Sequence, residues 1–261
     1  MALVENEAPL HGGKQAGKVY LVGAGPGAAD LITVRGARLL AQADVVLYDA
    51  LVTPEMLELC SPAELISVGK RSGQRSTAQE AINRLLVECA RKYKMVVRLK
   101  GGDPMLFGRA DEELRALEAE GIEVEIVPGI TTAVAAAATT KQPLTKRGVA
   151  RSVAFFTSST APDQPEHPAL PHTDTLVQYM GGREAAATAE RLLAQGRRAD
   201  TPVVVVENCS RPDERIARLT LSDLAQGLGT AHGPVLVMIG EALRLRAHQP
   251  ALAASTLCQA R

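Results

Sequence analysis

Short β-branched runs alternate with stretches rich in Ala, Leu, Glu and Arg in the first half of the chain, and this alternation constrains the fold most. The strand-like runs occupy residues 19–22, 44–48, 65–68, 95–100 and 124–127. Helical patterns lie between them, clearest over 77–92 and 109–120, and Thr77 with Glu80 forms a capping box at the start of the first. Alternating helices and continuously apolar strands predict a parallel sheet covered on both faces.

A polar and basic stretch at 141–151 interrupts this pattern and predicts an interdomain linker. A second set of strand-like runs follows it at 153–157, 175–180, 203–207, 214–220 and 235–240. The alanines at 133–138 are expected to form a small-residue helix face packed close to a sheet. The sequence therefore predicts two α/β domains, 18–140 and 152–245, with a flexible tail at 1–17 and a second tail at 246–261.

Charge and composition exclude several classes of function. The 29 basic residues match the 29 acidic ones, which argues against nucleic acid or an anionic membrane as the main partner. No apolar run is long enough to span a membrane, and the N-terminus lacks the apolar segment of a signal peptide. The four cysteines are scattered along the sequence, which predicts reduced thiols in the cytoplasm: Cys60, Cys89, Cys209 and Cys258. No histidine has other metal-ligating residues near it in the sequence, so no metal is expected.

Segments of unusual composition, most of them containing glycine, follow five of the expected strands. They lie at residues 23–27, 101–104, 128–132, 180–182 and 208–210. Ligands in open α/β sheets bind beyond the carboxyl ends of the strands, and glycine lets a backbone approach a ligand closely. One such loop is most simply a tight turn, but five at one sheet edge predict a cleft for a small molecule.

The first of these loops has a competing interpretation. Its sequence GAGPGA satisfies the dinucleotide fingerprint, and Asp49 follows at about the distance of a ribose-binding acid. Pro26, however, removes a backbone N–H where the fingerprint needs its phosphate-facing turn, and a dinucleotide fold explains neither GGDP nor PGIT. An NAD(P)-dependent oxidoreductase stays open as an alternative.

Long sequence blocks in a fixed order carry a resemblance to one enzyme family. They are VYLVGAGPGAADLITVRGARLLAQADVVLYD, VGKRSG, VVRLKGGDPMLFGRADEEL, VPGITTAVAAAA, PLTKRG, QYMGG, VVENCSRPDER and GPVLVMIGE. Over about residues 18–243 the chain closely resembles the uroporphyrinogen-III C-methyltransferases of the tetrapyrrole methylase class. GAGPG and GGDP alone indicate only the wider class, whereas the TVRG, YD, VGKR and GR-x-x-E blocks point to this member.

The resemblance implies the class III methyltransferase fold, with two α/β domains, S-adenosyl-L-methionine in the cleft between them, and a homodimer. By similarity the cofactor site would comprise Pro26, Gly101, Gly102, Asp103, Leu106, Thr131, Thr132, Met180 and Cys209. Asp103 would accept from the cofactor's hydroxyls or amine, and Met180 and the region of Cys209 would hold the adenine through the main chain. Thr132 and Cys209 replace smaller residues that are more usual in the family.

The implied substrate is uroporphyrinogen III, a macrocycle with eight carboxylates that the family methylates at two ring carbons to give precorrin-2. A ring carbon attacks the sulfonium methyl in line, and a proton leaves the macrocycle. Arginine suits the carboxylates because its fork pairs with them bidentately. We expect Arg109 with Glu112 and Arg147 to bind substrate, and Arg71 as a weaker candidate. An exposed ion pair and a solvated linker charge are the respective alternatives.

Two routes are open for proton handling. Asp49 and Lys70 follow two neighbouring strands and, within the family, look like the proposed proton acceptor and donor. A structural ion pair, or Asp49 capping the next turn, would explain the same residues. A route assisted by Arg109, with Glu112 beside it, is an equally fair proposal.

Other class III methylases, acting on later tetrapyrroles or on a macromolecule, remain alternatives, as does a non-catalytic sensor. The pathway served stays open among sirohaem, cobalamin and haem d1. Bifunctional relatives carry an added dehydrogenase–chelatase module, for which 261 residues leave no room, so the methyltransferase is expected to act alone.

Overall fold

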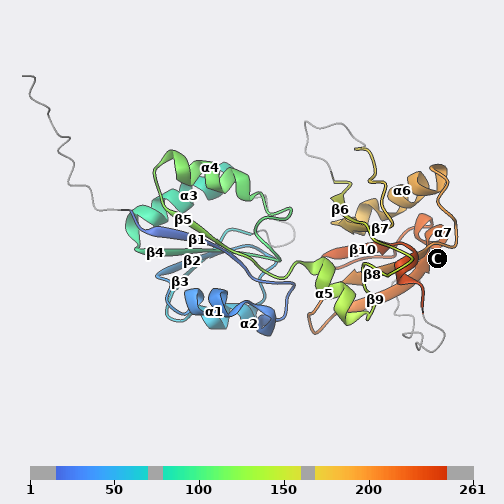
Figure 1. The fold of residues 1–261 in the computed structure, drawn as a ribbon. Helices are drawn as coiled ribbons and strands as arrows, with labels where there is room; N and C mark the ends of the chain where they lie inside the picture. The colour runs from blue at the N-terminus through green and yellow to red at the C-terminus, as the bar shows by residue number, and fades with distance from the viewer. Residues whose placement is uncertain (1–15, 70–78, 160–167, 246–261) are drawn as a thin grey trace, which may run out of the picture. The chain divides into compact units, whose positions relative to one another are not determined.

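The computed structural model describes residues 16–69, 79–159 and 168–245 and divides the chain into two compact units (Figure 1). The first unit comprises Met1–Gly23, Thr33–Lys100 and Pro104–Pro128; the second comprises Ala24–Ile32, Gly101–Asp103 and Gly129–Arg261. The division therefore falls at Pro128, ahead of the linker expected at 141–151, and two short loops from the first half belong to the second unit. Within the described ranges, no helix is long and apolar enough to cross a membrane.

The first unit is a parallel sheet between two layers of helices. Its strands are β1 (Lys18–Gly23), β2 (Val45–Tyr48), β3 (Glu64–Ser67), β4 (Met95–Lys100) and β5 (Val124–Val127), in the order β3-β2-β4-β1-β5. All four strand pairings are parallel, which confirms the arrangement that the continuously apolar strands predict.

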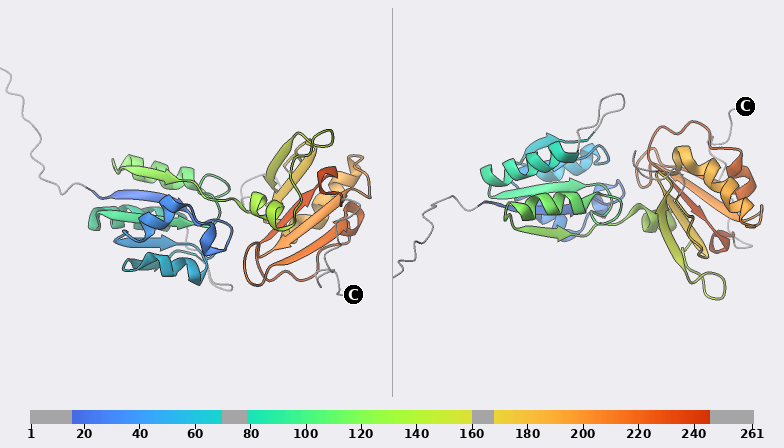
Figure 2. Two further views of the ribbon diagram at one scale, coloured as in Figure 1. Left: turned by 60° about the horizontal axis from the view of Figure 1, so that its bottom comes forward. Right: turned by 90° about the horizontal axis from the view of Figure 1, so that it is seen from above.

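Helices cover both faces of this sheet (Figures 1 and 2). One face carries α3 (Gln79–Lys92) and α4 (Ala110–Ala119), and the other carries α1 (Val34–Leu40) and α2 (Pro54–Leu57). Leu86 of α3 and Leu117 of α4 are fully buried in one cluster with the strand residues Leu21 and Leu47. Two short 3₁₀ helices, η1 (Ala29–Leu31) and η2 (Glu58–Cys60), complete the connections in the first half of the chain.

The strand order argues against a dinucleotide-binding fold. In that fold the first two strands are neighbours, whereas here β4 lies between β1 and β2. The glycine loop after β1 also leads into the three-residue η1, and α1 begins only at Val34. No long helix therefore follows that loop directly with its N-terminus toward a pyrophosphate.

The second unit is a mixed sheet with helices on both faces. Its strands are β6 (Val153–Thr157), β7 (Thr175–Tyr179), β8 (Pro202–Glu207), β9 (Arg215–Thr220) and β10 (Val235–Ile239), in the order β6-β7-β10-β8-β9. Only β6 and β7 pair in parallel; the other three pairings are antiparallel. The short η3 (Glu241–Leu243) follows β10.

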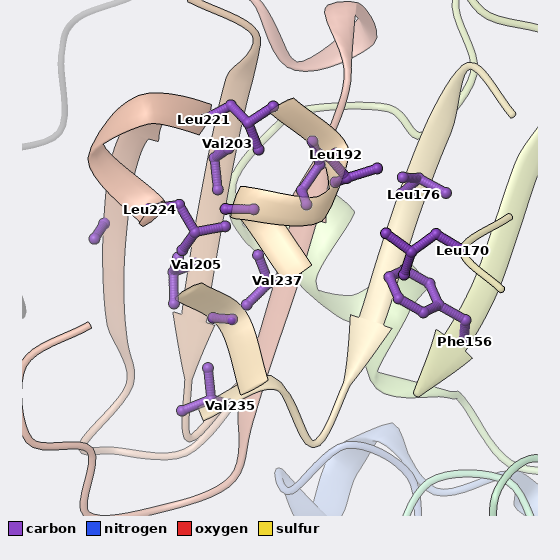
Figure 3. Close-up of a cluster of buried hydrophobic side chains, with 14 residues drawn as sticks. Phe156, Leu170, Leu176, Leu192, Val203, Val205, Leu221, Leu224, Val235 and Val237 are labelled. Atoms are coloured by element: carbon purple, nitrogen blue, oxygen red, sulfur yellow. The ribbon is translucent and has the colours of Figure 1, made fainter. Parts of the chain in front are cut away.

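Apolar clusters lie on both faces of this second sheet. On one face, α6 (Gly181–Ala194) and α7 (Leu221–Ala225) bury Leu192, Leu221 and Leu224 against Val205 and Val237 (Figure 3). On the other face, α5 (Thr132–Thr139) packs Ala133, Ala135 and Ala136 in a cluster with sheet residues such as Val204 and Met238. The small alanine side chains let this helix lie close to the sheet, as the sequence predicts.

All ten expected strands are present, and their ends differ from the expected ones by at most one residue. The helix expected at 109–120 is α4, and the one expected at 77–92 is α3 from Gln79 onward. Thr77, the first residue of the expected capping box, lies outside the described residues.

Candidate functional site

The first two glycine loops pair through their backbones. Gly25 N–H donates to Gly102 O at 3.1 Å, and Gly102 N–H donates to Gly25 O at 2.7 Å, which forms an isolated antiparallel bridge. Gly102 has a φ of +68°, and no heavy atom lies within 4 Å of the place that a Cβ would take. A left-handed backbone with open space beside it allows a ligand to approach the main chain closely.

Asp103 connects the second loop to the third. Its Oδ2 accepts a hydrogen bond from Gly129 N–H at 2.9 Å, and the side chain is half-buried. The aspartate therefore stands at the start of the 129–132 segment that leads into α5.

Tyr179 connects the third loop to the fourth. Its hydroxyl bonds Thr131 Oγ1 and accepts from Ala133 N–H at 3.1 Å. Thr131 is the N-cap of α5 but makes no side-chain cap bond, so Tyr179 caps the helix from another strand. Burial raises the pKa of Tyr179, which keeps the hydroxyl protonated at neutral pH.

The fifth loop bonds back to the first. Ser210 Oγ accepts from Ala28 N–H at 3.0 Å, and both residues belong to the second unit. Hydrogen bonds thus link 208–210 to Ala28 directly after the first loop, the first loop to 101–104, 101–104 to 128–132, and 128–132 to Tyr179, the residue before Met180.

Two expectations about these loops need correction. The strands before them belong to two sheets, so the loops do not share one sheet edge: β1, β4 and β5 lie in one sheet and β7 and β8 in the other. Residues 180–182 are also not a loop, because α6 begins at Gly181 and Met180 is its N-cap with a φ of +56°. Because glycine is also common in turns, the Gly-Gly pair at this helix start was expected to be a loop.

The nine expected cofactor residues differ in exposure and environment. Pro26 and Cys209 are buried, and burial raises the pKa of the Cys209 thiol to about 12. Met180 is exposed. The others are half-buried: Gly101, Gly102, Asp103, Leu106, Thr131 and Thr132. Eight of the nine belong to the second unit and Leu106 to the first.

Arg109 and Glu112 form a bidentate ion pair at the start of α4. Arg109 Nε lies 2.7 Å from Glu112 Oε1, and its Nη2 lies 2.7 Å from Oε2. The side chains are 57% and 44% exposed, so the exposed intrahelical pair that the sequence left open is the geometry found. Arg109 is the N-cap of α4, with a left-handed φ of +55°. The bond raises the pKa of Arg109 and lowers the pKa of Glu112.

Sequence reasoning missed a buried charge cluster next to this pair. Glu113, with no exposed side-chain surface, accepts from Arg98 Nε at 3.0 Å and from Lys100 Nζ at 2.9 Å. Burial lowers the pKa of Lys100. The available signal was two cations at alternate positions of an otherwise apolar strand, which places both on one face of the sheet.

Asp49 and Arg147 complete the expected site residues that lie in the described ranges. Asp49 Oδ1 accepts from Leu51 N–H at 2.9 Å, so the alternative in which Asp49 caps the next turn describes a real contact. Arg147 is exposed in the turn that Lys146 and Ala150 close through their backbones. The other two candidates lie outside the described residues: Lys70 and Arg71.

Comparison with known proteins identifies one matching family and several similar proteins. A family profile described as tetrapyrrole (corrin/porphyrin) methylases matches residues 18–225. A siroheme synthase from Tolumonas auensis is 48% identical over 88% of this chain and 50% of its own length. One from Pseudomonas paraeruginosa is 47% identical over 88% of this chain and 51% of its own length. The chain therefore spans about half the length of the curated relatives it matches.

Solved structures match most of the chain. A native structure of uroporphyrin III C-methyl transferase from Thermus thermophilus is 40% identical, with a TM-score of 0.77 over 87% of this chain and 94% of that one. The same enzyme complexed with S-adenyl homocysteine is 39% identical, with a TM-score of 0.79 over 90% and 97%. These matches confirm the class III methyltransferase fold that the resemblance implies. The profile and the relatives agree, and the chain belongs to the tetrapyrrole (corrin/porphyrin) methylases.

Proposed function

We propose that this chain is an S-adenosyl-L-methionine-dependent C-methyltransferase that methylates uroporphyrinogen III at two ring carbons to give precorrin-2. The observation that carries the proposal is the 40% identity, over 87% of the chain, to a solved uroporphyrin III C-methyl transferase. The 48% identity to a siroheme synthase favours sirohaem as the pathway, ahead of cobalamin or haem d1.

The cofactor would be held by the four hydrogen-bonded loops and by Met180 at the start of α6. The open, left-handed Gly102 admits a ligand against the main chain, and the half-buried Asp103 offers a carboxylate for a hydroxyl or amine. Thr131, Met180 and Cys209 would contact the remaining parts of the cofactor. When bound, S-adenosyl-L-methionine supplies an electrophilic methyl group on a sulfonium sulfur.

Arg109 would bind a carboxylate arm of the substrate. Its guanidinium already holds the carboxylate of Glu112 bidentately and remains exposed. A substrate carboxylate can take the place of Glu112 without a change in the type of hydrogen bond. Arg147, exposed on its turn, would bind a second arm, and Arg71 a third.

We assign proton acceptance to Asp49 and proton donation to Lys70, with Arg109 and Glu112 as the alternative route. Asp49 is half-buried and its carboxylate is oriented by the N–H of Leu51, which suits a group that must face one direction. We also propose a homodimer, as the family resemblance implies.

A second candidate is methylation of a later tetrapyrrole. A cobalt precorrin-4 methyltransferase from cobalamin biosynthesis is 32% identical, with a TM-score of 0.74 over 87% of this chain. Its identity is lower than that of the uroporphyrin enzymes, so this stays the alternative.

Incubation with methyl-labelled S-adenosyl-L-methionine and fresh anaerobic uroporphyrinogen III tests the proposal. We expect two labelled methyl groups per macrocycle, with Arg109→Ala as a variant that binds cofactor but transfers slowly. Tight binding of S-adenosyl-L-homocysteine without transfer to this macrocycle would overturn the substrate and favour later tetrapyrroles. Stabilisation by NADPH but not by S-adenosyl-L-homocysteine would overturn the reaction class.

A further inference from the structure

The loop after β8 touches the first glycine loop very closely. Ala28 N–H donates to Ser210 Oγ at 3.0 Å. A Cβ on Gly27 would lie 2.7 Å from Arg211 Cγ and 3.0 Å from Cys209 O. A Cβ there would displace the Arg211 side chain and crowd the Cys209 carbonyl, and the φ of +153° at Gly27 is one that other residues rarely adopt, so glycine favours this close approach of the two loops.

The loop that carries Ser210 has a backbone that only its surroundings can maintain. Asn208 and Ser210 have φ values of +51° and +59°, in the left-handed region that non-glycine residues seldom adopt. Asn208 is fixed from two sides, because its N–H donates to Pro234 O at 3.0 Å and its Nδ2 donates to Asp213 Oδ2 at 2.7 Å.

Glu214 fixes Ser210 itself. One carboxylate oxygen accepts from Ser210 N–H at 2.6 Å, and the other accepts from Thr139 Oγ1 at 2.8 Å at the end of α5. Glu207, fully buried just before the loop, accepts from the backbone N–H groups of His232 and Gly233. The backbone of Ser210 is therefore held by bonds that are independent of the one to Ala28.

We propose that Ser210, held by Glu214, is a positioning residue that sets cofactor affinity by anchoring the first glycine loop at Ala28. The inference rests on the proposed function, in which Cys209 contacts the cofactor, and on the family resemblance, which adds Pro26. Ser210 directly follows Cys209, and its partner Ala28 lies two residues after Pro26. Ser210 therefore acts on both residues through the main chain and needs no contact with the cofactor. Without its hydroxyl, the half-buried Ala28 N–H loses its partner, and the loop is held less firmly because the Gly25–Gly102 bridge then fixes it without support from Ser210.

Affinity for S-adenosyl-L-homocysteine, measured by calorimetry on the full chain, tests this directly. Ser210→Ala and Ser210→Gly should each weaken binding about three- to tenfold, the range of one hydrogen bond. Glycine removes the left-handed backbone cost, so the glycine variant should melt at or above the temperature of the alanine variant. A loss of affinity at undiminished stability separates positioning from folding.

Ser222→Ala is the matched control. Ser222 Oγ bonds Thr220 Oγ1, and Ser222 N–H donates to Ala199 O. Ala199 precedes β8, whereas Ser210 follows it, so Ser222 lies near the other end of that strand. Both substitutions remove one half-buried serine hydroxyl from the same unit. We expect the control to bind S-adenosyl-L-homocysteine as the unmodified chain does, and an equal loss in both variants would overturn the inference.

A double-mutant cycle tests the bond itself. Ala28 has a φ of −63°, which proline adopts, so Ala28→Pro removes the N–H without demanding a new φ at that residue. Each single variant should weaken binding, and the double variant should bind about as the weaker single one does, because both remove the same bond. Fully additive losses would overturn the role of this hydrogen bond.

Glu214 offers a rescue test. Glu214→Gln keeps an oxygen for Ser210 N–H, and its amide can donate to the hydroxyl of Thr139, so affinity should stay within about twofold. Glu214→Ala should lose about as much as Ser210→Ala. Equal affinities of the Ala and Gln variants would overturn the anchoring role of Glu214.

Asp103→Ala separates failure of this inference from failure of the proposed site. If Asp103→Ala weakens binding tenfold or more and Ser210→Ala does not, the anchoring role fails alone. If neither variant changes binding, the assignment of these loops to the cofactor fails as well. Transfer to uroporphyrinogen III is a separate measurement that neither result prejudges.

Discussion

Lys100 Nζ lies 2.9 Å from Glu113 Oε2, and the two side chains are only 4% and 0% exposed. Arg98 shares the same carboxylate from the neighbouring position on that face of β4. Two cations and one anion are thus enclosed between β4 and the first turn of α4. The cluster fixes the start of the helix that begins directly after Arg109.

Replacing Glu113 should strongly destabilise the fold. Glu113→Gln leaves two buried cations without an anion, which costs about 3–5 kcal/mol of unfolding free energy. Glu112→Gln, which breaks an exposed pair one residue earlier, should cost at most about 1 kcal/mol. Denaturant unfolding of both variants measures this, and similar costs for the two would contradict the burial argument.

An apolar replacement of the whole cluster gives the converse test. The combined variant Arg98→Met, Lys100→Met and Glu113→Leu removes all three charges together. Its unfolding midpoint should lie at a denaturant concentration at least as high as that of Glu113→Gln. A greater loss than in the single variant would mean that the ion cluster contributes net stability.

Arg109 should matter more for turnover than for the cofactor. Arg109→Ala removes the bidentate donor that we propose for a substrate carboxylate, so kcat/KM should fall by about 10- to 150-fold, equivalent to a charged hydrogen bond. S-adenosyl-L-homocysteine affinity should change less than twofold. Arg109→Lys keeps the charge but not the two parallel N–H donors, so its kcat/KM should lie between that of the unmodified chain and that of Arg109→Ala. Equal losses in turnover and cofactor binding would mean that Arg109 serves the cofactor.

Tyr179→Phe tests the helix cap supplied from β7. The substitution leaves Ala133 N–H without its acceptor and removes the partner of Thr131, so the unfolding free energy should drop by about 1–3 kcal/mol. Tyr48→Phe, on a half-buried tyrosine at the end of β2, is a comparison substitution of the same chemistry. Thermal or denaturant unfolding should show the larger loss for Tyr179.

Thiol reactivity should follow burial. Burial raises the pKa of Cys209 to about 12 and that of Cys60 to about 11. At pH 8 a thiol with a pKa of 12 is about 10⁻⁴ ionised, against about a quarter for an ordinary cysteine. Iodoacetamide at pH 8 should therefore spare both in the folded protein, and alkylation should accelerate about tenfold per pH unit toward pH 10. Peptide mapping checks this, and rapid alkylation of folded Cys209 at pH 8 would contradict it.

The strands could be predicted from the sequence because each is a short apolar run bounded by glycine, proline or polar residues. The start of α6 was not predicted because Gly181 and Gly182 are typical of a loop, although glycine at a helix start lowers stability only slightly. Helices α1 and α2 span only 7 and 4 residues, too few for a clear period. The order of the strands depends on long-range pairing, which the local pattern does not encode.

The loops of the candidate site were recognisable from their glycines, but the bonds between them were not. Ser210 and Ala28 lie 182 residues apart, and neither has a local pattern that names its partner. The same holds for Glu113, whose place in the first turn of α4 reads as an ordinary acidic residue near a helix N-terminus. Local chemistry therefore predicted where the loops lie, and only the folded chain shows what holds them.

The wide separation of Ala28 from Ser210 has a consequence for synthesis. At about 5–20 residues per second, a ribosome adds Ser210 roughly 10–40 s after Ala28. During that interval all of the first sheet has been made, and its parallel strands can pair, while the first glycine loop still lacks its anchor. A nascent chain or truncated fragment that ends between Val127 and Ser210 would therefore carry a complete first sheet and a first glycine loop without its bond to Ser210.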